Sequence, residues 1–174
     1  MNFHPPQFFT ATILNWISLL TSDVYKKIII DSLRFLTEKQ KVKVYGFVIM
    51  PNHIHLIWQA NETLNPSDVQ RDFLKFTGQM MKFEMEKNDS NQLEKFHVRL
   101  KDRKYQFWQR NSLSIELRGR EMIEQKLDYI HNNPVQGKWM LTDSPAGYRY
   151  SSYSFYELEK SDWLFLYHYM EMDE

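Results

Sequence analysis

Two histidines separated by one residue, His53 and His55, are the side chains with the clearest potential for chemistry. Residues 53–58 favour a strand, and side chains two apart on a strand point to the same face. Both imidazoles would then project from one face, with Ile54 directed to the other. Two neutral imidazoles side by side form part of a ligand set for a divalent cation. The alternative is a pair of exposed strand histidines without a metal.

A third ligand and a nucleophile are available on the last long predicted helix. Tyr129 and Asn133 are four residues apart, so they share a face of that helix. Tyr129 lies off the apolar stripe formed by Ile123, Leu127 and Ile130, which leaves its phenol available for chemistry. The alternative is a surface tyrosine without a catalytic role, in a chain that contains 10 tyrosines.

Together, these side chains could cut a phosphodiester. A phenol with a pKa near ~10 is a weak nucleophile at neutral pH unless it is activated. A divalent ion on the non-bridging phosphate oxygens would neutralise their charge and orient the scissile bond. Two histidines and one amide oxygen leave coordination positions open for those oxygens. Mg²⁺ or Mn²⁺ suits such a site better than Zn²⁺, although imidazoles bind Zn²⁺ readily. The product would be a phosphotyrosine bond, which permits rejoining.

The elements that would hold these residues are predicted in the order strand, helix, strand, strand, helix, an irregular basic segment and helix. Strand-forming residues predict three strands, at residues 8–14, 42–50 and 53–58. Apolar residues at helical spacing predict three helices, at residues 23–39, 67–83 and 119–132. The polar residues 84–95 are predicted to form a loop. This order predicts an α+β sandwich, an antiparallel sheet with helices packed on one face.

The middle helix is predicted to begin at a capping box, with Ser67 as the N-cap and Gln70 three residues on. Its apolar face is predicted to contain Phe73, Phe76, Met80 and Phe83. Basic side chains form a second stripe along this helix. They could bind the phosphates of a nucleic acid, or they could form an ordinary solvated face.

Residues 95–110 contain six basic side chains against Asp102, a local surplus of five. Tyr105, Phe107 and Trp108 are interleaved with them, and the coincidence of charge and aromatic rings favours DNA binding. This segment could grip a hairpin stem or stack a base on Trp108. The predicted DNA contacts are Arg71, Lys75, Lys82, Arg103, Lys104, Trp108 and Arg110.

The composition limits the class of protein. A chain of 174 residues suits one domain, here residues 1–174 with an aromatic tail at about 148–174. The 22 basic and 22 acidic side chains give no net charge, which is unusual for a nucleic-acid binder, although local clustering matters more. The absence of cysteine excludes disulfides and thiolate metal sites. No signal peptide or membrane-spanning run is found, so a soluble, intracellular protein is expected.

Two runs of residues resemble signatures of a known family. Met50-Pro51-Asn52-His53-Ile54-His55-Leu56 resembles the MPNHxHL signature of the HUH single-tyrosine transposases. Tyr129-Ile130-His131-Asn132-Asn133-Pro134-Val135 resembles the YIHxNPV signature of their REP-associated (RAYT) branch, in the IS200-like family. Phe107–Arg110 and Ser151–Tyr153 are similar to two lesser blocks, so the resemblance spans residues 8–156. Gln136-Gly137-Lys138 departs from relatives that have a basic residue followed by Ala-Gly, which puts local DNA contacts in doubt.

The resemblance implies a ferredoxin-like or RRM-like sandwich with both histidines on a central strand. It implies that His53, His55 and Asn133 bind the metal and that Tyr129 is the nucleophile. It further implies a single-stranded DNA substrate with a hairpin, a 5′-phosphotyrosine intermediate and a free 3′-OH. It also implies a bacterial protein in the cytoplasm, associated with the nucleoid.

Three other functions fit parts of the sequence. An RRM-like module could hold single strands without cutting them, but it would place aromatic residues where His53 and His55 stand. A metal-dependent hydrolase could activate water, with Tyr129 as a bystander, and would leave no protein joined to DNA. A domesticated protein could retain the fold in a host role. The sequence also leaves open whether the protein is a monomer or a homodimer, and whether Tyr129 serves its own metal site or a partner's.

Overall fold

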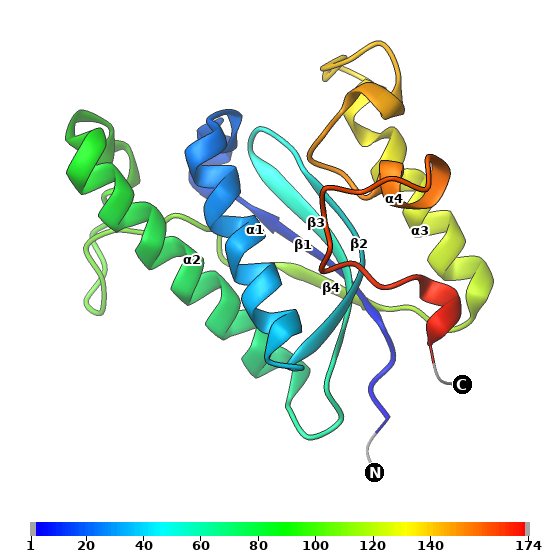
Figure 1. The fold of residues 1–174 in the computed structure, drawn as a ribbon. Coiled ribbons are helices and arrows are strands. Elements are labelled where there is room, and N and C mark those ends of the chain that lie inside the picture. Colours follow the sequence, from blue (N-terminus) through cyan, green and yellow to red (C-terminus); the bar gives the residue numbers. More distant parts are fainter. Residues whose placement is uncertain (1–2, 173–174) are drawn as a thin grey trace.

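The computed structural model describes residues 3–172 and contains a four-stranded antiparallel sheet (Figure 1). The strands are β1 (Gln7–Thr12), β2 (Val42–Ile49), β3 (His53–Ala60) and β4 (Leu113–Glu116), in the order β2-β3-β1-β4. With a helix after β1 and another after β3, this is the βαββαβ arrangement of ferredoxin-like folds. The predicted α+β class is confirmed.

Helices cover both faces of the sheet. Helices α1 (Asp23–Glu38) and α2 (Pro66–Asn88) pack on one face, as expected, whereas α3 (Arg120–Asn132) lies on the opposite face against β2 and β3 (Figure 1). The short α4 (Tyr153–Glu157) follows in the C-terminal part. The expectation of helices on a single face therefore holds for α1 and α2 and fails for α3, because the sheet buries apolar side chains on both faces.

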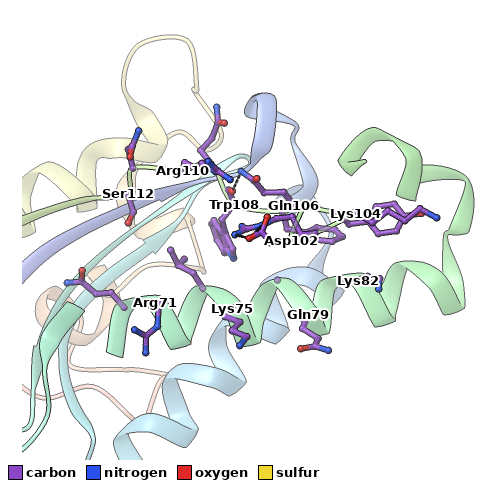
Figure 2. A pocket seen from close by; sticks show the side chains of 18 of the residues that line it. Arg71, Lys75, Gln79, Lys82, Asp102, Lys104, Gln106, Trp108, Arg110 and Ser112 are labelled. Atoms are coloured by element: carbon purple, nitrogen blue, oxygen red, sulfur yellow. Dashed lines mark hydrogen bonds and ion pairs between the residues drawn. The ribbon is translucent and has the colours of Figure 1, made fainter. Parts of the chain in front are cut away.

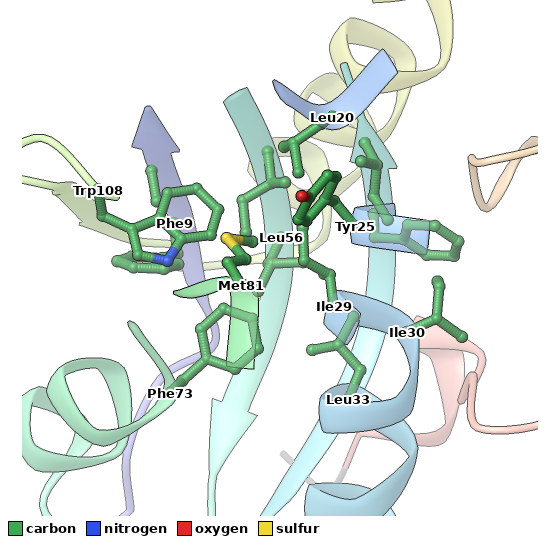
Figure 3. Packing of buried hydrophobic residues seen from close by; sticks show 14 of the residues in the cluster. Phe9, Leu20, Tyr25, Ile29, Ile30, Leu33, Leu56, Phe73, Met81 and Trp108 are labelled. Atoms are coloured by element: carbon green, nitrogen blue, oxygen red, sulfur yellow. The ribbon is translucent and has the colours of Figure 1, made fainter. Parts of the chain in front are cut away.

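The alternation of side chains along β3 separates two cores. Leu56 enters the core beneath α1 and α2, where it meets Phe9 and Met81 (Figure 3). Ile57 enters the smaller core beneath α3. His53 and His55 share the side of Ile57, since residues two apart on a strand face the same way. The strand period thus directs both imidazoles towards α3.

Helix α2 differs from its prediction at the N-terminus. Asn65 is the N-cap, because its side chain accepts a hydrogen bond of 2.9 Å from the Ser67 backbone N–H, and Pro66 occupies the first turn. The predicted capping box at Ser67 is therefore wrong by two residues. The predicted loop at 84–95 is also wrong, since α2 continues to Asn88 and a 3₁₀ helix spans Ser90–Phe96.

The buried face of α2 is turned away from the predicted one. Phe73 is buried as expected, but Phe76, Met80 and Phe83 are exposed. The helix instead buries residues at intervals of four, Phe73, Thr77, Met81 and Met85. Thr77 tolerates burial because its hydroxyl donates to the Phe73 carbonyl at 2.8 Å and accepts from the Trp108 indole at 3.0 Å.

The edge strand β4 and the segments that cover the β2 edge lie outside the three predicted strands. Strand β4 pairs antiparallel with β1, but all four of its residues are exposed, so its sequence carries little strand signal. At the other edge, the aromatic tail adds to β2, with Tyr167 N donating to Val44 O at 2.9 Å and Ile49 N donating to Tyr150 O at 2.9 Å. The tail therefore completes the β2 edge. Within residues 3–172, no helix is both long and apolar enough to cross a bilayer.

Gly46 allows α3 to approach β2 closely. A Cβ atom at this position would lie 2.7 Å from Leu127 Cδ2 and 3.2 Å from Ile130 Cδ1, both buried in the core beneath α3. We expect Gly46→Ala to lower the free energy of unfolding by about 1–3 kcal/mol, because a packed core resists added volume. Chemical denaturation measures this change.

Gly78→Ala is the matched control for Gly46→Ala. A Cβ at Gly78, inside α2, would meet Trp108 Cδ1 at 3.7 Å, which is an ordinary contact. Alanine also favours helices over glycine by roughly 0.5–1 kcal/mol, so this variant should be neutral or more stable. Equal destabilisation by both substitutions would contradict the close packing assigned to Gly46.

Candidate active site

All four residues predicted to carry the chemistry meet between β3 and α3. The ring centroids of His53 and His55 are 4.9 Å apart, and those of His55 and Tyr129 are 5.5 Å apart. The side-chain oxygen of Asn133 lies 3.3 Å from His53 Nε2. These contacts lie within one chain, so a single copy brings the tyrosine to the histidines.

Asn52 fixes the orientation and the tautomer of His53. Its side-chain amide donates to the Trp16 carbonyl at 3.3 Å, which leaves the amide oxygen to face His53 Nδ1 at 2.8 Å. Since that oxygen only accepts, Nδ1 carries the proton and Nε2 presents a lone pair. Burial lowers the pKa of His53 and the charge of Lys138 adds to this shift, whereas a hydrogen bond from the protonated ring to the Asn133 oxygen opposes it.

His55 is held in a mostly apolar environment. It is 5% exposed, stacks on Phe8 with the ring centroids 5.1 Å apart, and its Nδ1 lies 2.7 Å from Thr10 Oγ1. Burial lowers its pKa to about 3, and the neighbouring charges of His53 and Lys126 act in the same direction. The imidazole is thus neutral at physiological pH, the form that binds metals.

The side chains fit a divalent cation. His53 Nε2 and Asn133 Oδ1 are electron-pair donors 3.3 Å apart. Neighbouring ligands of an octahedral Mg²⁺ or Mn²⁺ ion stand at a similar separation, about 3 Å. The contacts from Asn52 and Thr10 to the Nδ1 atoms are the supporting interactions that metal-binding histidines need. Among residues 3–172, no group of three or more His, Asp or Glu side chains is placed to hold a metal ion, and the oxygen donor beside His53 is the amide of Asn133.

Tyr129 lies at the open side of the site. Its side chain is 45% exposed, while the stripe of Ile123, Leu127 and Ile130 is buried as predicted. The ammonium of Lys126, one turn earlier, lies 5.6 Å from the Tyr129 ring and 4.8 Å from the Phe8 ring. Among the described residues, Lys126 has no carboxylate at ion-pair distance. This cation is therefore available to stabilise negative charge on the phenol oxygen or on a phosphate.

His131 points away from the site into the core beneath α3. It is 5% exposed, and its Nε2 lies 2.8 Å from Ser152 Oγ, which in turn accepts from the Phe47 backbone N–H at 3.0 Å. Burial lowers the pKa of His131 to about 4. The two histidines of this region have separate roles in the fold, since His131 ties α3 to β2 and His55 faces the site.

The depressed pKa of His131 predicts a loss of stability in mild acid. Below its ordinary pKa of 6.5, the unfolded chain takes up a proton that the folded chain binds only near pH 4. The free energy of unfolding should therefore fall by about 1.4 kcal/mol for each pH unit across this window. Denaturation of His131→Gln should show a smaller fall between pH 6.5 and pH 4.

Ser152→Ala separates this titration from simple packing. The variant loses the hydroxyl that contacts His131 but keeps the imidazole, so it should be less stable at every pH with the acid dependence retained. His55 contributes to the same dependence, so His131→Gln should reduce it without removing it. Identical acid dependence in the wild type and His131→Gln would contradict the assignment.

The predicted DNA contacts line one groove. It lies between α2 and residues 102–112 and has a volume of about 990 Å³ (Figure 2). The predicted residues that line it are Arg71, Lys75, Lys82, Arg103, Lys104, Trp108 and Arg110. The groove opens on the α2 side of the sheet, whereas the two histidines face α3.

The charges in this groove differ in their availability. Arg71 pairs with Asp68 at 2.7 Å and with Asp72 at 3.0 Å, and Arg103 pairs with Asp102 at 2.9 Å. Lys82 lies 3.5 Å from Glu86. Among the described residues, the remaining three cations (Lys75, Lys104 and Arg110) have no carboxylate within 4.0 Å, so they can neutralise phosphates directly.

Trp108 does not present a stacking surface. It is 6% exposed, and its indole N–H donates to Thr77 in the interior. The prediction that a base stacks on this ring is wrong for this structure, because the basic segment buries its aromatic side chains to attach itself to α2 and β1. Phe107 is buried in the same way.

Sequence reasoning did not identify Thr10, Asn52 and Lys126 as parts of the site. Asn52 had a signal, because it directly precedes His53 within the quoted signature. Lys126 stands one turn before Tyr129 and could have been found by helix spacing. Thr10 could not be found from the sequence, since its contact with His55 depends on the register between β1 and β3.

Comparison with known proteins assigns the chain to a family. The family model described as "Transposase IS200 like" matches residues 16–133, more than half of the chain. A solved REP-associated tyrosine transposase bound to a REP hairpin is 19% identical, with a TM-score of 0.66 over 88% of this chain and 79% of that chain. A candidate transposase from Deinococcus radiodurans is 13% identical, with a TM-score of 0.49 over 74% of this chain and 91% of that chain. No curated protein matches the sequence. The chain belongs to the IS200-like transposase family.

Proposed function

We propose that this transposase cuts and rejoins single-stranded DNA through a covalent bond between Tyr129 and a 5′ phosphate. The observation that carries the proposal is the meeting of Tyr129 with His53, His55 and Asn133 between β3 and α3. An exposed phenol beside two neutral imidazoles and an amide oxygen suits metal-assisted phosphoryl transfer.

In the cleavage step, the Tyr129 oxygen attacks the scissile phosphorus and loses its proton to solvent. The bond from phosphorus to the 3′ oxygen breaks, and this oxygen leaves as a 3′-OH after gaining a proton. Attack by a 3′-OH on the phosphotyrosine reverses the step and frees Tyr129. Lys126 lies close enough to the phenol to stabilise its negative charge.

His53, His55 and Asn133 would hold a divalent cation, Mg²⁺ or Mn²⁺. When bound, this ion supplies charge neutralisation at the non-bridging phosphate oxygens. Asn52 and Thr10 keep the two imidazoles oriented towards it. Zn²⁺ also binds imidazoles, so the metal requirement is part of the test.

The proposed substrate is a single strand that carries a hairpin. The solved neighbour with a TM-score of 0.66 is bound to a REP hairpin, which supports the same class of ligand here. The basic groove between α2 and residues 102–112 is the proposed site for its phosphates, with Lys75, Lys104 and Arg110 as the available cations. We further propose that residues 1–174 act as one domain and that each copy uses its own Tyr129.

The test is to incubate the protein with labelled single-stranded hairpin oligonucleotides and Mg²⁺ or Mn²⁺, and to resolve the products under denaturing conditions. A denaturant-resistant protein–DNA adduct supports the proposal. Cleaved DNA without an adduct would instead favour a water-activating hydrolase. Tight binding to many hairpins without cleavage would favour an RRM-like binding module.

A further inference from the structure

The turn after β1 contains two strained residues. Asn15 and Trp16 both have φ of +54°, in the left-handed region. Asparagine tolerates this conformation, but a bulky aromatic residue seldom adopts it, because its Cβ approaches the backbone carbonyl. Such conformations persist where the surrounding structure imposes them, and they cluster at ligand-binding sites. The strain at Trp16 therefore calls for a functional explanation.

The turn is anchored to the proposed metal site. The Ile13 backbone N–H donates to the Asn52 carbonyl at 2.8 Å, and the Trp16 carbonyl accepts from the Asn52 side chain at 3.3 Å. Asn52 in turn contacts His53 Nδ1 at 2.8 Å. Trp16 is thus two hydrogen bonds from a proposed metal ligand, and the position of its backbone is coupled to that of His53.

The indole of Trp16 is free for a ligand. It is 66% exposed, whereas Trp58, Trp108 and Trp163 are each 6% exposed or less. Across residues 3–172, no aromatic ring or cation lies within stacking distance of Trp16. The strained turn is held by backbone hydrogen bonds and by Asn52, and it leaves most of the indole exposed to solvent.

The same turn borders the basic groove. Leu14 N donates to Phe107 O at 2.8 Å, and Gln109 N donates to Thr12 O at 2.7 Å, so the groove segment runs alongside residues 12–14. Thr12 is also the register partner of His53. The turn at the end of β1 therefore connects the groove segment to the histidine strand, and Trp16 lies in this turn, on a direct path for single-stranded DNA between the two.

We propose that Trp16 binds an unpaired nucleobase by stacking, at the point where single-stranded DNA passes from the basic groove to the metal site. An indole face accepts any base, so the contact adds affinity with little sequence preference. The strained turn holds the Trp16 backbone against Asn52, the residue that contacts His53 Nδ1, and the stacked base would fix the neighbouring phosphate near Tyr129. The inference rests on the proposed function for its ligand, but the stacking contact does not require the tyrosine chemistry.

The test compares two strands with the same phosphates by fluorescence anisotropy. One is a labelled thymidine oligonucleotide of about 12 nucleotides and the other is an abasic strand of equal length. Trp16→Gly removes the ring and suits the left-handed backbone, so it should fold. We expect it to bind the thymidine strand about 10-fold more weakly and the abasic strand with wild-type affinity. Trp16→Phe should retain most of the difference.

Phe35→Ala is the control, since Phe35 is 52% exposed on α1 and does not line the basic groove. Equal weakening of both strands by Trp16→Gly, or no weakening, would overturn the proposal. A change in self-association without a change in DNA binding would assign the ring to a protein interface and would also overturn it. Carrying the measurement out in Tyr129→Phe keeps it independent of cleavage, so failure of the adduct assay and failure of stacking are separate results.

Discussion

Tyr129→Phe is expected to abolish the covalent protein–DNA adduct, with a loss of about 10⁴-fold or more in cleavage rate. The substitution removes one oxygen atom, the proposed nucleophile, and keeps the ring that contacts His55 and Lys126. Because the Tyr129 side chain is 45% exposed, the free energy of unfolding should change by less than about 0.5 kcal/mol. Denaturing electrophoresis of labelled oligonucleotides measures the adduct.

The control for Tyr129→Phe is Tyr167→Phe, which removes a hydroxyl at the β2 edge, away from the site. This variant should form the adduct at the wild-type rate. Binding of the hairpin should be unchanged in Tyr129→Phe, since the basic groove lies on the other face of the sheet. If cleavage persists in Tyr129→Phe, the nucleophile is water and not the Tyr129 oxygen.

His53→Ala is expected to reduce adduct formation by about 10²-fold or more at a fixed concentration of Mn²⁺. It removes a lone pair that faces Asn133 Oδ1 at 3.3 Å and leaves two proposed ligands for the cation. Part of the activity should return at high metal concentration, because the remaining ligands still bind weakly. A chelator should stop the wild-type reaction, and titration of Mg²⁺ or Mn²⁺ measures the shift in metal requirement.

Two neighbouring asparagines provide a matched comparison for the metal site. Asn133→Leu should raise the metal requirement, whereas Asn132→Leu should not, because the Asn132 side chain donates to the Asp128 carbonyl instead. Asn133→Asp should retain activity, since a carboxylate is a good ligand for Mg²⁺ or Mn²⁺. An unchanged metal requirement in both His53→Ala and Asn133→Leu would exclude this ligand set.

The parts of the site that depend on local geometry could be predicted from the sequence. Strand alternation placed His53 and His55 on one face, and helix spacing placed Tyr129 above Asn133. The meeting of these two pairs depends on α3 packing against the sheet, which local pattern does not specify. The family resemblance supplied that step, and the 3.3 Å contact between His53 and Asn133 agrees with it.

The sequence-based predictions that were wrong failed for one physical reason, since tertiary packing decided each of these features. Helix α2 has several apolar side chains on its surface, so periodicity alone could not choose Thr77 as the buried position over Phe76. Strand β4 is fully exposed and short, and only its pairing with β1 defines it. Trp108 lies among basic residues but is buried by contacts with Thr77. Trp16 is exposed because a turn with positive φ projects it, and such turns are hard to recognise without glycine.

The central claim is that DNA becomes attached to Tyr129, and peptide mapping of the adduct tests it most directly. Trypsin cleaves after Lys126 and Lys138, and the peptide between them, residues 127–138, contains Tyr129 as its only tyrosine. After nuclease digestion of the adduct, mass spectrometry should find the nucleotide phosphate on this peptide, at the tyrosine. A nucleotide on any other peptide, or cleaved DNA with peptide 127–138 unmodified, would contradict the account.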